Sequence, residues 1–171
     1  MKIACLGGGP AGLYFAISMK LRDPSHDVTV IERNRADDTF GWGVVLSDET
    51  LANLHANDPE SADSIKEYFA YWDDIALVHQ GQRLVSSGHG FCGIGRKRLL
   101  LLLQARAAEL GVTLQFETDI EDIDALCAAH DLVVAADGVN SRVRAHFDAA
   151  FKPEIDRRAC KFVWLGTHQK F

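Results

Sequence analysis

Six residues near the N-terminus have the types and spacing of a dinucleotide-binding turn, Gly7-Gly8-Gly9-Pro10-Ala11-Gly12, which is a G-x-G-x-x-G pattern. The first glycine of this pattern permits a tight turn, the second lets the backbone approach a pyrophosphate, and the third lets a helix pack closely on a strand. The free N–H groups of the following helix favour an anion there. The residues predicted to contact this anion are Gly7, Gly9, Pro10, Ala11 and Gly12.

An acidic residue lies at the distance from this turn that an adenosine site requires. Glu32 follows the apolar run 28–31, which is the second expected strand, and both Glu32 and the next residue, Arg33, are predicted to contact the dinucleotide. A carboxylate at this point of the motif accepts hydrogen bonds from an adenosine ribose. It would also repel a 2′-phosphate, so FAD and NAD are compatible with the site and NADP is not expected. The alternative is a glycine-rich turn with an unrelated glutamate.

A second group of polar residues follows another apolar run. The segment from Asp131 to Arg144 reads DLVVAADGVNSRVR, so a buried strand is expected to present Asp137 and Gly138 at its end. A carboxylate there can accept a ribityl or ribose hydroxyl, and a glycine lets the backbone come close to a ligand. The alternative is an exposed Asp-Gly turn before a solvated basic helix.

This segment resembles the second fingerprint of the class A, single-component flavoprotein monooxygenases, which is an apolar strand, Asp-Gly, and then Ser and Arg. The resemblance implies FAD as the cofactor, with Asp137 and Gly138 near its pyrophosphate and in a region linked to reduced-nicotinamide binding. It implies that Arg96, at the start of the helix that Gly111 ends, reaches FAD, and that Ile120 lies beside the adenine. A solvated arginine on an exposed turn is the alternative for Arg96.

The string Gly41-Trp42-Gly43-Val44-Val45-Leu46-Ser47 is similar to one branch of that family, which hydroxylates aryl-CoA thioesters such as salicylyl-CoA and 2-aminobenzoyl-CoA, or tryptophan derivatives. The segment KFVWLGT at 161–167 extends the similarity. The resemblance implies that NADH or NADPH reduces FAD, that O2 is activated, and that an aromatic substrate is hydroxylated, with 5-hydroxylation of salicylyl-CoA favoured. The alternative is that Trp42 and Trp164 are simply large packed side chains.

No side chain is predicted as a catalytic acid or base, because the cofactor carries the oxygen chemistry. His89 is the histidine of most interest, and Cys127 with His130 lacks the second pair of ligands that a metal site needs, so no metal is predicted. Three other functions stay open: a non-oxygenating FAD enzyme, a nucleotide-binding module without activity, and an NAD-only domain. The Asp-Gly segment counts against the last.

The elements that must position these residues alternate along the chain. Apolar runs predict strands, and apolar residues at helical spacing predict helices. The expected strands are 2–6, 28–31, 112–116, 131–136 and 161–166, and the expected helices are 10–22, 47–54, 99–110 and 140–147. A loop is expected at 34–46 and a surface helix or loop at 57–66. The segment 72–95 is expected to hold a β-hairpin that turns at Gln80-Gly81.

This alternation predicts an α/β, Rossmann-like FAD-binding domain with a mainly parallel sheet and an inserted β-hairpin. The expected division is a FAD-binding domain over 1–150, with its β insertion around 72–95, and the start of a substrate-domain sheet over 151–171. The resemblance also implies a later Gly-Asp motif and most of a substrate-covering sheet. Neither occurs before Phe171, so we expect a truncated substrate domain and no activity from the chain alone.

Bulk properties exclude several classes of protein. The net charge of −6 disfavours a nucleic-acid or anionic-membrane binder. The longest leucine run, 99–103, is far shorter than the ~20 apolar residues of a membrane span, and the N-terminus lacks a secretory signal. The four scattered cysteines are typical of reduced thiols. We therefore expect a cytoplasmic protein whose partner is an aromatic small molecule, with no nucleic acid and no membrane.

Overall fold

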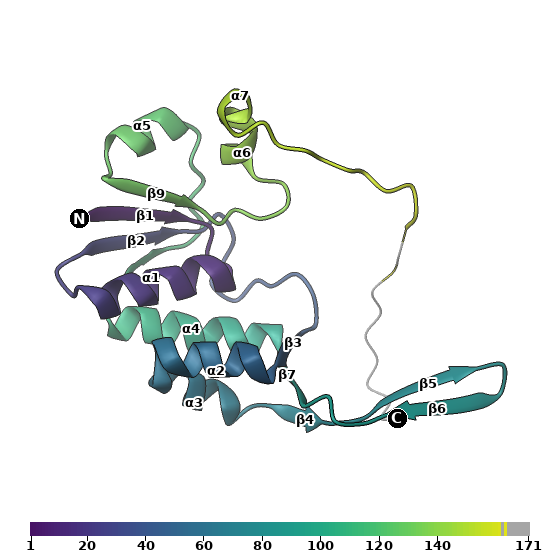
Figure 1. The fold of residues 1–171 in the computed structure, drawn as a ribbon. Helices are drawn as coiled ribbons and strands as arrows, with labels where there is room; N and C mark the ends of the chain where they lie inside the picture. Colours follow the sequence, from purple (N-terminus) through teal and green to yellow (C-terminus); the bar gives the residue numbers. More distant parts are fainter. Residues whose placement is uncertain (162, 164–171) are drawn as a thin grey trace.

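The centre of the protein is a four-stranded parallel sheet, seen in a computed structural model that describes residues 1–161 and 163 (Figure 1). Its strand order is β8-β2-β1-β9. The strands are β1 (Lys2–Leu6), β2 (Asp27–Ile31), β8 (Thr113–Gln115) and β9 (Leu132–Ala135). The predicted α/β fold with a mainly parallel sheet is confirmed.

Both faces of β1 are buried, as expected for the interior strand of a parallel sheet. Ile3 and Cys5 point into a core formed with α1 (Pro10–Arg22) and α4 (Arg96–Glu109). Ala4 and Leu6 point into a second core on the other face. The helices on that face are α5 (Ile123–Ala128) and α6 (Arg142–His146), followed by α7 (Asp148–Phe151). The sheet is thus covered on both sides.

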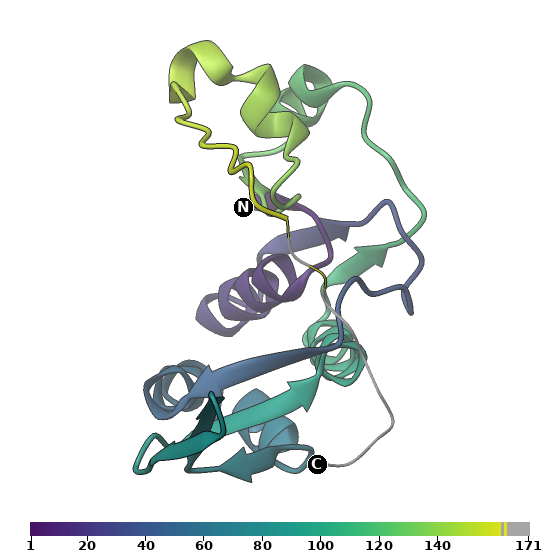
Figure 2. The ribbon, with the colours of Figure 1, turned by 90° about the vertical axis from the view of Figure 1, so that its right-hand side faces the viewer.

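A second, antiparallel sheet lies beside this core with the order β3-β7-β4 (Figure 2). Its strands are β3 (Gly43–Ser47), β7 (Phe91–Gly95) and β4 (Ala70–Trp72). The prediction of a loop over 34–46 is therefore wrong from Gly43 onward. Val44 packs against the main core and pairs with Ile94, which is distant in the sequence, so this strand is held by tertiary contacts.

Two helices connect β3 to β4 within this antiparallel sheet, α2 (Asp48–Asn57) and α3 (Pro59–Lys66). The helix expected over 47–54 is confirmed and extends to Asn57, and Ser47 caps it, since its hydroxyl accepts a hydrogen bond from the Thr50 N–H at 3.3 Å. The segment predicted as a surface helix or loop is a helix, but Ile65 and Ala62 are buried in it. One face of α3 packs against α4, so this segment is less exposed than its polar composition suggested.

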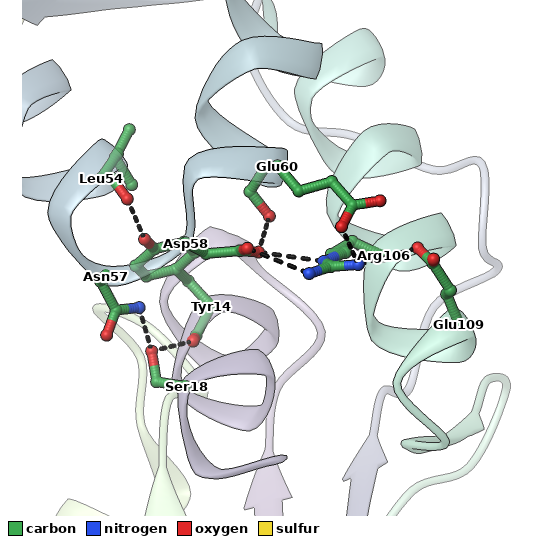
Figure 3. Close-up of polar contacts among 9 residues, drawn as sticks. Tyr14, Ser18, Leu54, Asn57, Asp58, Glu60, Arg106 and Glu109 are labelled. Carbon is green, nitrogen blue, oxygen red and sulfur yellow. Dashed lines mark hydrogen bonds and ion pairs between the residues drawn. The ribbon is translucent and has the colours of Figure 1, made fainter. Parts of the chain in front are cut away.

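A buried ion pair fixes α3 on α4 (Figure 3). The Asp58 carboxylate accepts hydrogen bonds from Nε and Nη2 of Arg106, both at 3.0 Å, and from the Ser61 hydroxyl at 2.6 Å. Burial by itself would raise the pKa of Asp58, but the hydrogen bonds from Arg106 and Ser61 and the charge of Arg106 outweigh it and lower that pKa.

Two hydrogen bonds join α2 to the first helix. The Tyr14 hydroxyl donates to the Leu54 carbonyl at 3.1 Å, and the Asn57 amide donates to the Ser18 hydroxyl at 2.8 Å (Figure 3). These two bonds hold α2 against α1.

The predicted hairpin is confirmed and extends away from the rest of the protein (Figure 1). It consists of β5 (Ile75–His79) and β6 (Gln82–Ser86), and every residue in both strands is exposed. Gln80 and Gly81 have positive φ values of 49° and 78°, as a two-residue type I′ turn requires.

The other boundaries follow the expected pattern. Helix α4 ends at Glu109, and Gly111 follows with φ 79°. The predicted strand over 161–166 lies outside the described residues, apart from Lys161 and Val163. Within the described part of the chain, no helix is long and apolar enough to cross a membrane.

Candidate functional site

The glycine loop is compressed where β1, β9 and α1 meet. Gly7 has φ 112°, and a Cβ there would collide with the Ala136 carbonyl. A Cβ on Gly12 would collide with the Gly7 carbonyl, so the helix can approach the loop only because this residue is glycine. Gly9 differs, since a Cβ there would meet no atom within 4 Å. The loop is thus packed on its inner side and open at Gly9.

Helix α1 presents its N-terminus at this opening. Gly9 is its N-cap, Pro10 occupies its first turn, and that turn holds no acidic residue. The N–H groups of a first helical turn have no partner within the helix, and the helix dipole places a partial positive charge there. The geometry is that of an anion-binding helix terminus.

A cavity of about 210 Å³ lies at the carboxyl ends of β1, β2 and β9. Because β1 is flanked by β2 on one side and β9 on the other, this is the point at which the strand order reverses, where open α/β sheets bind their ligands. Seven of the predicted residues line the cavity, drawn from distant parts of the chain. They are Gly7, Gly9, Glu32, Arg33, Arg96, Asp137 and Gly138.

Four predicted residues do not line this cavity. Pro10 and Ala11 lie in the first turn of α1, and Gly12 is buried against the loop. Ile120 packs against the core that contains Ile31, while its carbonyl accepts a hydrogen bond from Arg142 at 2.6 Å. The structure places Thr118 and Asp119, rather than Ile120, at the cavity wall.

The Glu32 carboxylate is held by three N–H donors. Its Oε2 accepts from the Gly8 backbone at 2.7 Å, and its Oε1 accepts from the backbone and the side-chain amide of Asn34 at 2.8 and 2.6 Å. The side chain therefore has a fixed orientation at the edge of the cavity.

Two buried polar atoms at the cavity have no hydrogen-bond partner among the described residues. They are Oδ1 of Asp137 and Nε of Arg96. The other Asp137 oxygen accepts from the Arg142 N–H at 2.8 Å, at the start of α6. Buried polar groups are nearly always satisfied in native proteins, so a free acceptor and a free donor beside a cavity fit a polar ligand.

Several cavity residues were not predicted from the sequence. They are Asn34, Phe40, Thr118, Asp119, Asn140 and Arg142. Asn34 lies two residues after Glu32, so its proximity to the site could have been inferred from the sequence. Asp119 and Arg142 form an ion pair between distant parts of the sequence, for which no local pattern exists.

His89, Cys127 and His130 do not line this cavity. His89 is outside the cavity lining, with its Nε2 2.7 Å from the Ser86 hydroxyl and its ring stacked on Phe91. Within residues 1–161 and 163, no group of three potential metal ligands occurs.

The parallel sheet, the glycine loop and the acidic residue after β2 define a Rossmann-like dinucleotide-binding domain. The salicyloyl-CoA 5-hydroxylase of a Streptomyces species is 44% identical over 171 residues, which cover 100% of this chain and 33% of that protein. Protodeoxyviolaceinate monooxygenase of Chromobacterium violaceum is 35% identical over 175 residues, covering 100% of this chain and 46% of that protein. The chain therefore corresponds in sequence to a part of the class A FAD-dependent aromatic monooxygenases, 33–46% of the length of the proteins it matches.

The structural comparison agrees with this assignment at the level of the fold. The crystal structure of P. aeruginosa PqsL in complex with 2-aminobenzoylacetate superposes with a TM-score of 0.72 at 16% identity, covering 94% of this chain and 48% of that one. No protein-family model matches the chain. The chain spans a third to a half of the length of the curated relatives it matches.

Proposed function

We propose that this chain is the FAD-binding part of a flavin-dependent monooxygenase that hydroxylates an aromatic substrate. The observation that carries the proposal is the convergence of the glycine loop, Glu32, Arg96 and Asp137 on one cavity at the switch point of the sheet. The open position at Gly9 and the unpaired atoms of Asp137 and Arg96 fit a large polar cofactor.

Each group in the cavity has a distinct proposed task. The loop and the N-terminus of α1 would bind the diphosphate, and the charge of Arg96 would balance it. Glu32 would accept a ribose hydroxyl, with Arg33 beside the adenosine. Asp137 and Gly138 would contact the ribityl chain or the reduced nicotinamide. Bound FAD would supply the redox and oxygen chemistry, with NADH or NADPH as the electron donor.

The proposed substrate is an aryl-CoA thioester, and salicylyl-CoA in particular. The support is the 44% identity to the Streptomyces salicyloyl-CoA 5-hydroxylase along all of this chain. A hydroxyl group on the ring activates the position para to it, which is carbon 5 of a salicylyl group. The protein would then act in the cytoplasm, and this chain by itself would give no hydroxylated product.

FAD binding tests the proposal directly. We expect the purified chain to bind FAD, and we expect ADP-ribose, but not FMN, to compete, because Glu32 and the loop recognise the adenosine diphosphate half. Glu32→Ala should weaken FAD binding by at least about tenfold, since it removes a charged hydrogen-bond acceptor. Glu67→Ala, at an exposed position outside the cavity lining, is the matched control. Tight NAD binding without FAD binding would replace this proposal with a plain dinucleotide-binding domain.

We also propose that residues 1–150 form the FAD domain, with the hairpin as its β insertion, and that residues 151–171 begin a substrate domain. One hairpin face carries Ile75, Leu77 and Leu84, and the other carries Val78 and Val85, all exposed. A two-stranded hairpin has marginal stability in water, and one that is apolar on both faces is suited to burial between further layers.

The chain alone should therefore show exposed apolar surface that maps to the hairpin. Val78→Glu is expected to lower the fluorescence of ANS, a dye that binds apolar surface, and to reduce light scattering with little change in Tm. Val139→Glu, at a loop valine that is 84% exposed, is the control and should change neither signal. Equal dye signals from wild type and Val78→Glu would show that the hairpin is not the exposed apolar surface.

A further inference from the structure

The orientation of the Glu32 side chain depends mainly on Asn34. A carboxylate has about four acceptor positions, two on each oxygen. Asn34 occupies both positions of Oε1 through its backbone and amide N–H groups, and Gly8 occupies one position of Oε2. One acceptor position remains, on Oε2, which matches a single ribose hydroxyl.

The backbone of Asn34 is itself held by a hydrogen bond. Its carbonyl accepts a hydrogen bond from the Glu117 N–H at 3.1 Å, next to the pairing of β2 with β8. The backbone of Glu32 is held in the same way, by Gln115 and Thr118. Because the backbones on both sides are anchored, the Asn34 amide is a rigid donor rather than a flexible surface group.

The glycine loop contacts the opposite side of the Glu32 side chain. A Cβ on Gly8 would lie 2.9 Å from the Glu32 Cβ, so the side chain of Glu32 rests directly on the loop backbone. Glu32 is therefore confined between Gly8 and Asn34, and Asn34 is the only one of these two neighbours that contributes a side-chain hydrogen bond.

We propose that Asn34 is the positioning residue of the adenosine-ribose site, which holds the Glu32 carboxylate so that its free acceptor position faces the cavity. This inference rests on the proposed function, because it assumes an adenosine diphosphate in the cavity. It extends the recognition element from Glu32 alone to the pair of Glu32 and Asn34.

The test uses ADP-ribose as the probe, with affinity measured by calorimetry on the purified chain. Asn34→Asp keeps the shape of the side chain but replaces its N–H donor with an acceptor facing Oε1. We expect affinity at pH 8 to fall by at least about tenfold, the loss of one charge-assisted hydrogen bond. Affinity should recover toward pH 5, because two adjacent carboxyl groups share a proton that restores the donor.

Two further variants separate positioning from general effects. Asn34→Ser retains a hydroxyl donor and should keep affinity within about threefold of wild type. Asn140→Asp adds the same charge to another asparagine of the cavity lining and should show no recovery between pH 8 and pH 5.

The outcomes distinguish this inference from the proposed function. Wild type that binds neither ADP-ribose nor FAD would overturn both. Wild type that binds, together with an Asn34→Asp variant of equal affinity at pH 8, would overturn only the inference. Equal losses in Asn34→Asp and Asn140→Asp without recovery at low pH would show that charge alone, and not the hydrogen bond to Glu32, sets the affinity.

Discussion

Replacing Asp58 with alanine is expected to lower the free energy of unfolding by about 3–5 kcal/mol, because it removes the buried carboxylate and leaves the Arg106 guanidinium with exposed partners alone. Asp58 is 2% exposed and Arg106 is 12% exposed, so water cannot replace the lost contacts. The remaining acidic partners, Glu60 and Glu109, are well exposed and contribute little. Urea unfolding followed by circular dichroism measures the difference.

Asp63 offers a matched control on the same helix. It is exposed and lies 3.7 Å from Lys66, so Asp63→Ala should change the free energy of unfolding by no more than about 0.5 kcal/mol. A loss below about 1 kcal/mol for Asp58→Ala would contradict a stabilising role for the Asp58–Arg106 pair.

The ion pair also makes stability depend on pH. The pKa of Asp58 is lowered in the folded protein, so its contribution is present above the unfolded pKa of about 4 and is lost as pH falls through the folded value. The difference in free energy of unfolding between wild type and Asp58→Asn should therefore stay constant from about pH 8 to pH 5. It should then shrink below about pH 4.

Alanine substitutions at two glycines of the loop are also expected to have large effects, one on stability and the other on FAD binding. Gly12→Ala should destabilise the fold by about 3 kcal/mol or more, because its Cβ would overlap the Gly7 carbonyl and backbone must move. Gly9→Ala should leave Tm nearly unchanged, since its Cβ enters open space and φ is −74°. It should nevertheless weaken FAD binding by at least about tenfold, because the Cβ occupies the path of the diphosphate.

Thermal melts and FAD titrations on the same two preparations distinguish these effects. A Gly9→Ala variant that binds FAD like wild type would show that the diphosphate does not approach this residue. A Gly12→Ala variant with an unchanged Tm would show that the helix can move away from the loop without cost.

The N-terminal part of the fold was predictable because its determinants are local. Strand β1, the glycine turn, α1 and β2 follow one another directly in the sequence, and Pro10 and Pro24 mark the ends of the helix between the strands. The hairpin was predictable for the same reason, since Gln80 and Gly81 join two apolar runs directly.

The antiparallel sheet was not predictable from local pattern. Strand β7 reads FCGIG, and its glycines weaken any strand propensity. It exists because Cys92 and Ile94 are buried and because β3 and β4 pair with it on either side. Such pairing depends on contacts between residues that are far apart in the sequence.

The candidate site divides in the same way. Glu32 and Asp137 each come after an apolar strand, so the direction of that strand predicts that the residue lies at the carboxyl end of the parallel sheet. Asp119 meets Arg142 only because β8 and β9 belong to one sheet. Asp58 lies in an acidic segment that reads as solvated, and only its distant partner Arg106 explains its burial.

The position of β1 between β2 and β9 also sets the order in which the nascent protein can acquire its structure. β1 can pair with β2 as soon as synthesis has passed Ile31, but β9 ends at Ala135, so the other edge of β1 stays open while the intervening chain is made. At the usual rate of synthesis, that interval lasts roughly 5–20 s on the ribosome. During it, an apolar strand edge is exposed to other chains. The cavity at the ends of β1 and β9 can therefore form only after the five described helices that precede β9, α1 to α5, have been made.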